Sequence, residues 1–156
     1  MRENSKTSIL ELEKSLSDPI DLEIRTIELK NNASVQIAFL RGMADPAPVI
    51  NVLTQNNLDS LKDVAFAAAG TVLAATEDIP VKFYLYRGAT IVYLPNQEPF
   101  AVLTSSMAKR ALSEPTYESA IRGPRDGFIE DIFDNLSLIR RRLPDPNLKL
   151  PLYSNR

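Results

Sequence analysis

Apolar and polar positions along the first two-thirds of the chain follow two different spacings, one typical of helices and one typical of strands. Segment 7–16 places apolar residues at helical spacing, which predicts a short amphipathic helix. Segments 21–29 and 34–41 instead alternate apolar and polar residues, and the Asn-Asn pair between them favours a tight turn. We therefore expect a helix followed by two antiparallel strands.

The segment between residues 45 and 104 predicts further helices and strands. Asp45 precedes Pro46, which is typical of a helix cap followed by proline at the first helical position. Gly70 stands where a glycine cap would end an alanine-rich helix. The other expected elements are a helix from Pro46 to about Asn56, a helix over 58–69, a short buried strand over 71–74, a strand or short helix over 80–86, and two strands over 89–94 and 100–104 joined as a hairpin.

A rigid turn is predicted at residues 122–127. Gly123 is followed by Pro124, which fixes one backbone dihedral angle and lacks a backbone donor. Arg122 and Arg125 flank this pair, so the turn is also strongly charged.

An amphipathic helix is predicted directly after this turn. Asp126 stands at the expected N-cap, and Glu130 and Asp131 are expected in the first turns, where carboxylates complement the positive end of the helix dipole. Three consecutive arginines lie in the last turn, and Pro144 ends the helix. The apolar residues at helical spacing predict one apolar stripe made of Ile129, Ile132, Phe133, Leu136, Ile139 and Leu143.

Composition restricts the chemistry that this chain can perform. Its 156 residues, 44% hydrophobic and 24% charged, fit one globular domain with or without a fragment of another. A net charge of −2 indicates no general attraction to nucleic acid or anionic membranes. The absence of histidine and cysteine excludes Ser-His-Asp and Cys-His catalysis, histidine-zinc sites and disulfides. The longest apolar run, 64–75, falls short of the about 20 residues of a spanning helix, so the chain itself is expected to be soluble.

Four features of the second half of the chain carry a resemblance to a known family. They are Glu114-Pro115, Glu118, the run from Ile121 to Phe128 and the run from Asn135 to Arg142. In this order and register they resemble the signature of the A subunits of nutrient germinant receptors, the GerA family of spore germination proteins.

The resemblance implies an N-terminal region built from α/β subdomains. It favours a short helix over 80–86, because a helix there would let residues 89–94 enter the sheet. We therefore predict an α/β fold with a mixed β-sheet layered with helices, followed by a linking amphipathic helix and the start of a truncated second subdomain. The first subdomain is expected to cover 1–121. Residues 122–156 would hold the Gly-Pro hinge, the arginine-rich helix and the opening strand, over 148–153, of the second.

Two interpretations of the charged turn remain open. Its arginines could pair with nearby carboxylates and clamp the turn against the domain, or they could hold an anion at a helix N-terminus. The arginines of the last helical turn are expected to complement the helix dipole and contact acidic residues of a neighbouring domain or subunit, with nucleic acid or lipid headgroups as the alternative. The candidate clamp and interface residues are Glu114, Glu118, Arg122, Gly123, Pro124, Arg125, Asp126, Gly127, Glu130, Asn135, Arg140, Arg141 and Arg142.

The carboxylates of the chain are not spaced for catalysis. Glu130, Asp131 and Asp134 share the polar side of the predicted helix and are expected to be solvated, as are Asp21 and Glu23 on a predicted strand. We therefore expect no catalytic residues, no metal site and no cofactor, and a protein that is not an enzyme.

The resemblance implies a role in assembly and signal transmission during nutrient-triggered spore germination. Such receptors combine A, B and C subunits in the inner spore membrane. The expected partners are therefore B- and C-type subunits and further copies of the A subunit, without nucleic acid. This chain would form a soluble domain on the cytoplasmic face, with membrane association only through missing C-terminal helices or partner subunits. The alternative is a small-ligand-binding or anion-binding α/β module that uses residues 122–127.

Overall fold

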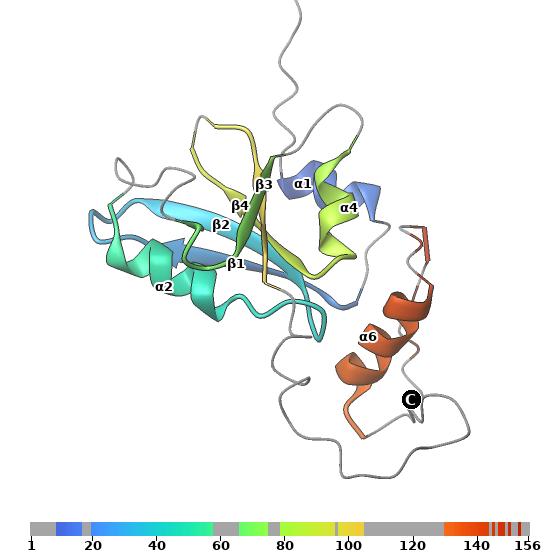
Figure 1. Cartoon of the computed structure of the whole chain (residues 1–156). Coiled ribbons are helices and arrows are strands. Elements are labelled where there is room, and N and C mark those ends of the chain that lie inside the picture. The colour runs from blue at the N-terminus through green and yellow to red at the C-terminus, as the bar shows by residue number, and fades with distance from the viewer. Residues whose placement is uncertain are drawn as a thin grey trace, which may run out of the picture.

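One five-stranded β-sheet forms the centre of the molecule, with helices against both of its faces (Figure 1). The computed structural model describes residues 9–16, 20–57, 66–74, 79–95, 97–104 and 130–143, together with residues 145, 147, 148, 150 and 153. The strands are β1 (Leu22–Glu28), β2 (Ser34–Leu40), β3 (Thr71–Ala74), β4 (Ala89–Tyr93) and β5 (Phe100–Leu103). The helices are α1 (Ile9–Ser15), α2 (Ala47–Gln55), α4 (Val81–Leu85) and α6 (Ile132–Arg142).

The strands follow the order β1-β2-β4-β5-β3, and all four pairings between them are antiparallel. The α/β layer fold is therefore as predicted, but the parallel pairs of a mixed sheet are not seen among the described strands. The reason is the position of the connecting helices. A crossover helix usually joins parallel neighbours. Here α2 leads from β2 to β3, and α4 leads from β3 to β4, and neither pair of strands is adjacent in the sheet.

Strict alternation along β2 creates two separate apolar cores. Val35, Ile37 and Phe39 point to one face, where they pack with α2 and the segment around Phe66. Ala38, Leu40 and their neighbours on the other face pack with α1 and α4. Because successive strand residues point to opposite faces, a central strand covered on both sides is apolar at nearly every position.

Several local predictions are confirmed. Asn32 has a positive φ of 57° in the turn between β1 and β2. Segment 80–86 forms the helix α4 rather than a strand, with Pro80 as its N-cap and Gly88 at a φ of 80° just beyond it. The predicted start of the next helix was one residue early: Pro46, not Asp45, is the N-cap of α2, although the Asp45 side chain accepts a hydrogen bond from the backbone N–H of Ala47 at 3.1 Å.

Gly70 has a different role from the predicted one. Its φ is not positive, so it does not form a left-handed cap. Instead, a Cβ at this position would lie 2.2 Å from the carbonyl oxygen of Leu103 on β5. Glycine is required here because the backbone passes close to the neighbouring strand as β3 begins.

The predicted start of the C-terminal helix was wrong. The N-cap of α6 is Asp131, which accepts from the backbone N–H groups of Phe133 and Asp134, so Glu130 and Asp131 precede the helix rather than forming its first turns. The expected strand over 148–153 lies partly outside the described residues and stays a prediction; Leu148, Leu150 and Tyr153, which are described, are not in a strand. The division into subdomains at residue 121 stays a prediction.

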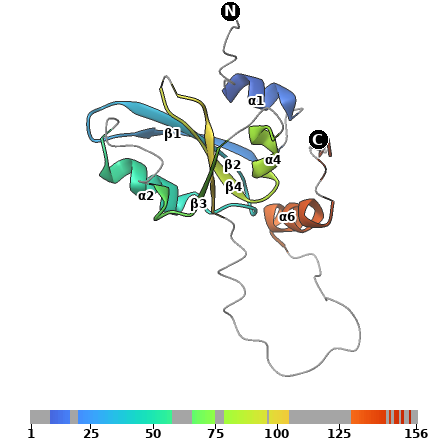
Figure 2. The same cartoon turned by 45° about the horizontal axis from the view of Figure 1, so that its top comes forward.

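α6 lies outside the layers of the sheet, beside the end at which β1 begins and β2 ends (Figures 1 and 2). None of the helices that the structure describes combines the length and the apolar character that crossing a bilayer would require.

Candidate functional site

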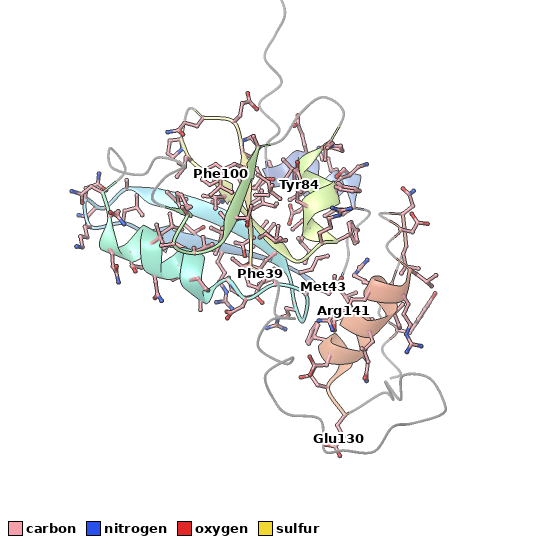
Figure 3. All side chains as sticks on the ribbon, in the orientation of Figure 1. Phe39, Met43, Tyr84, Phe100, Glu130 and Arg141 are labelled. Atoms are coloured by element: carbon pink, nitrogen blue, oxygen red, sulfur yellow. The ribbon has the colours of Figure 1, made fainter. Side chains whose placement is uncertain are left out.

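Three segments of the sheet layer converge on α6. They are Asp21 just before β1, the turn Arg41–Met43 just after β2, and Tyr86 just after α4. The antiparallel register pairs Leu22 with Leu40, and the backbone N–H of Arg41 donates to the carbonyl of Asp21 at 2.9 Å. The first two segments are therefore adjacent, and Figure 3 shows Met43 and Arg141 near each other where α6 meets the body.

A buried ion pair joins α6 to this end of the sheet. The Arg140 guanidinium donates from Nε to Asp21 Oδ2 at 2.5 Å and from Nη2 to Asp21 Oδ1 at 2.7 Å. Both side chains are 0% exposed. The two parallel bonds match a planar guanidinium to a planar carboxylate, so the pair restrains orientation as well as distance.

The surroundings of Arg140 favour its charged form. Burial on its own would lower the pKa of Arg140, but the hydrogen bonds and charge of Asp21 prevail and hold that pKa above its ordinary value. The guanidinium also lies over the ring of Tyr86, 5.1 Å from its centroid. Burial raises the pKa of Tyr86, which keeps its phenol neutral. The Nη1 atom of Arg140 has no hydrogen-bond partner among the described residues.

This ion pair is better suited to fixing geometry than to adding stability. Removing two charges from water costs several kcal/mol per ion, and their attraction offsets this cost only when the geometry is good. A buried pair is therefore weak evidence for stability, yet either residue without the other would be a buried, uncompensated charge.

Backbone contact with Gly42 brings α6 close to the sheet. Gly42 has a φ of 75°, and a Cβ there would lie 2.7 Å from the carbonyl oxygen of Phe133 and 3.1 Å from the Cβ of Ser137. Arg141 Nη2 donates to the carbonyl of Gly42 at 3.3 Å. Glycine is needed both for its left-handed backbone and for the absence of a side chain.

Arg41 forms a second, more exposed link. Its guanidinium lies 4.5 Å from the ring centroid of Phe133, and its Nε donates to Glu23 Oε2 at 2.7 Å. Arg25 donates to the other oxygen of Glu23 at 2.5 Å. Burial acts to raise the pKa of Glu23, but the hydrogen bonds from the two arginines prevail and lower it below its ordinary value of 4.5.

The face of α6 that meets the sheet differs from the predicted apolar stripe. Its buried residues are Leu136, Ser137 and Arg140, and the Ser137 hydroxyl donates to the backbone carbonyl of Asp134 at 2.7 Å. Within the predicted stripe, Ile132 is 50% exposed and Leu143 is 58% exposed. The helix therefore contacts the sheet through a mixed polar face that only partly overlaps the stripe.

The structure describes only some of the predicted site residues. Arg140 and Arg141 lie at the junction, Asn135 is half-buried, and Glu130 and Arg142 are exposed. Figure 3 shows Glu130 at the end of α6 that is far from the sheet. The remaining candidates, outside the described residues, are Glu114, Glu118, Arg122, Gly123, Pro124, Arg125, Asp126 and Gly127, so the clamp and the anion-binding interpretations of that turn both stay predictions.

Sequence patterns missed several residues of the junction, including Arg41, whose guanidinium lies over Phe133. Asp21 was expected to face solvent but is fully buried, and neither Gly42 nor Tyr86 was expected to contact α6. The sequence did contain one indication that Arg140, rather than Arg142, would face the sheet. Arg140 follows Phe133 by seven residues, so it lies on the same side of the helix, unlike Arg142.

Metal ligands do not gather in the described part of the chain. No group of three or more carboxylates, the ligand type that this sequence offers, comes together there.

Relatives of the chain are recognisable over almost its whole length. The family described as Bacillus/Clostridium GerA spore germination protein matches residues 10–154. The chain belongs to the GerA family. This GerA-family chain is 30% identical over 155 residues to spore germination protein GerLA of Bacillus cereus, a match that covers 92% of the chain and 32% of GerLA. It is 27% identical over 153 residues to spore germination protein GerQA of the same organism, with 94% and 30% covered.

A third relative shows higher sequence identity over a shorter region. Spore germination protein A1 of Bacillus subtilis (strain 168) is 40% identical over 65 residues, which cover 41% of the GerA-family chain and 14% of that protein. The chain spans about a third of the length of GerLA and GerQA. All three of these relatives are spore germination proteins by name.

The fold resembles the crystal structure of the N-terminal domain of the A subunit of the Bacillus megaterium spore germinant receptor GerK3. The TM-score is 0.65 at 19% identity, and the match covers 92% of the GerA-family chain and 58% of that chain. This likeness shows the fold alone, and it agrees with the predicted α/β class.

Proposed function

We propose that this chain is an N-terminal domain of a spore germinant receptor A subunit, and that it acts in receptor assembly and signal transmission during spore germination. Membership of the GerA family and the names of its relatives support the process. The buried Asp21–Arg140 pair supports the mechanism, because it holds α6 in one orientation relative to the sheet.

The mechanical argument starts from how α6 is attached. Apolar contacts are not directional, so on their own they define the orientation of a helix less sharply than paired hydrogen bonds do. A bidentate ion pair and a close backbone contact at Gly42 restrict rotation and sliding. A displacement imposed on either side of the junction would therefore pass to the other as a rigid-body movement.

The partners and location of the domain are part of the same proposal. The domain acts on the cytoplasmic face of the inner spore membrane, in a complex with B- and C-type receptor subunits and further A subunits. No catalytic step, cofactor or nucleic acid is required for this role.

The test separates orientation from folding. In the double variant Asp21→Leu with Arg140→Met, apolar side chains replace the buried charges, which usually preserves stability. Spores that carry this variant in the A-subunit gene are expected to lose nutrient-triggered release of dipicolinic acid while immunoblots show normal amounts of the A subunit. Lys30→Met removes an exposed charge from the turn between β1 and β2 and serves as the control, with germination retained.

Two results would contradict the proposal. One is a normal germination rate in the double variant. The other is a normal response to all nutrients in spores from which the gene has been deleted.

A further inference from the structure

Two partly exposed arginines at the edge of the junction are held by one carboxylate. Arg25 lies on β1, and Arg41 lies just after β2. Arg25 Nε donates to Glu23 Oε1 at 2.5 Å, and Arg41 Nε donates to Glu23 Oε2 at 2.7 Å. Because both bonds end on the same carboxylate, the two guanidiniums are held near each other. We call Arg25 and Arg41 the arginine pair.

An aromatic ring supports each guanidinium of the arginine pair. The guanidinium carbon of Arg25 lies 5.2 Å from the ring centroid of Phe39, and that of Arg41 lies 4.5 Å from the ring centroid of Phe133. A guanidinium that contacts a ring and donates from Nε to a carboxylate has little freedom to reorient. Much of the conformational entropy that a free arginine loses on binding a ligand has therefore already been lost in folding.

The terminal nitrogens of the arginine pair are open to a ligand. Within the described part of the chain, the side-chain hydrogen bonds of both arginines come from Nε alone. The side chains are 45% and 48% exposed. Each arginine therefore presents its Nη1 and Nη2 donors as a fork that the described residues do not occupy.

The arginine pair also carries an excess of positive charge. Its two guanidiniums share the single carboxylate of Glu23, so one positive charge is not matched within the cluster. The neighbouring carboxylates do not cancel it. Asp21 is already paired with Arg140, and Glu28 points to the opposite face of the sheet from Glu23, because strand residues alternate between faces.

We propose that the arginine pair binds a phosphate group. A phosphate monoester offers three acceptor oxygens and nearly two negative charges, so it can accept from the forks of both arginines at once. Inorganic phosphate, a soluble phosphate ester and a phospholipid headgroup all present this chemistry. The inference goes beyond the proposed function, because it requires neither receptor assembly nor a signal.

The first experiment titrates the purified chain with sodium phosphate at constant ionic strength and follows the arginine Nε–H resonances by NMR. The resonances of Arg25 and Arg41 are expected to shift together, with a dissociation constant of about 1–10 mM. Arg87 provides a comparison within the same molecule. Its guanidinium lies 4.6 Å from the ring centroid of Phe83, but among the described residues it shares no carboxylate with a second arginine, so its resonance should show no saturable shift.

Variants separate the paired forks from charge alone. Arg25→Gln is expected to weaken phosphate binding by about tenfold or more, and its contacts are with Glu23 and Phe39 rather than with α6. Arg87→Gln is the matched control and should leave binding unchanged. The double variant Arg25→Lys with Arg41→Lys keeps both charges but removes the planar forks, so binding should again weaken by about tenfold. Circular dichroism checks that each variant is folded.

A second experiment identifies the source of the phosphate group. The chain is sedimented with phosphatidylcholine vesicles that contain about 20% phosphatidic acid, and with vesicles of phosphatidylcholine alone. Phosphate-induced shifts together with co-sedimentation on the acidic vesicles, lost in Arg25→Gln, would assign the site to a lipid headgroup. The same shifts without co-sedimentation would assign it to a soluble phosphate compound.

Three results would overturn the proposal. Resonances of the arginine pair that show no saturable shift up to ~50 mM phosphate would mean that Glu23 already satisfies both arginines. Binding that survives Arg25→Gln would place the site elsewhere on the chain. A lysine double variant that binds as tightly as the wild type would show that charge alone attracts the anion.

Discussion

The cores of the sheet and the junction with α6 are both buried, but different interactions stabilise them. Each face of the sheet buries a cluster of aliphatic and aromatic side chains, among them Ile37 and Leu53, which are 0% exposed. The junction instead buries a charge pair, a serine and a single leucine, Leu136, and places the backbone of Gly42 against the helix. The core lowers the free energy of the fold through many similar contacts, whereas the junction relies on a few dissimilar ones.

The difference teaches where stability and geometry come from in this protein. The stabilisation from apolar burial is additive and depends little on exact geometry, because about 25 cal/mol is gained per Å² of apolar area that leaves water. Polar contacts depend on angle and distance, and a buried polar group that lacks its partner is strongly unfavourable. We therefore expect substitutions in the core to change stability in proportion to volume, and substitutions in the junction to change it according to which partner remains.

The largest effect is expected for Arg140→Met, which leaves the Asp21 charge buried without a partner. The free energy of unfolding should fall by about 3–5 kcal/mol. Urea denaturation followed by tyrosine fluorescence measures this change. Arg142→Met, at an exposed position, is expected to stay within about 0.5 kcal/mol of the wild type. Equal effects of the two substitutions would show that the ion pair does not restrain the junction.

A core truncation, Leu53→Ala, is expected to cost about 2–5 kcal/mol, because it removes buried methyl groups and leaves a cavity under α2. Leu10→Ala provides the exposed leucine for comparison and should change little. Hydrogen exchange sharpens the contrast. Leu53→Ala should accelerate exchange on α2 more than on α6, and the reverse pattern would remove the distinction between core and junction.

Gly42→Ala is expected to destabilise the protein by about 1–3 kcal/mol through backbone strain and steric contact. The new Cβ would lie 2.7 Å from the Phe133 carbonyl oxygen, so α6 must shift. Asn32→Ala isolates the strain component, because Asn32 also has a positive φ but is exposed in a turn. A Gly42 substitution no more costly than the Asn32 one would mean that α6 does not rest on Gly42.

The smallest effect is expected for Glu23→Gln, less than about 1 kcal/mol because Glu23 and its arginines are partly exposed. The folded protein lowers the pKa of Glu23 below 4.5, so the carboxylate contributes its full stabilisation above that pH and loses it as pH falls through the folded-state pKa. The difference between wild type and Glu23→Gln, measured by urea denaturation from pH 7 to pH 3, should therefore shrink with acidity. A difference that is constant with pH would rule out the paired carboxylate as its source.

Local patterns predicted most of the sheet layer because its signals repeat. Alternation marked β1 and β2, and the flanking turn residues marked the hairpin of β4 and β5. Pattern alone left segment 80–86 open between strand and helix, and the family resemblance resolved it correctly as α4. The start of α6 was predicted at Asp126 instead of Asp131 because both aspartates fit an N-cap.

By itself, the sequence determined the α/β class, the apolar face of each strand and the charge order of α6, because these follow from the spacing of residue types along one element. Only the tertiary structure decided that Arg140, and not Arg142, is the buried arginine, that its partner is Asp21, 119 residues away, and that Ile132 and Leu143 stay exposed while Leu136 is buried. The physical reason is that these features depend on how α6 is rotated about its own axis, which is set by contacts with distant segments. Periodicity within a helix states which residues share a side, but not which side faces the rest of the protein.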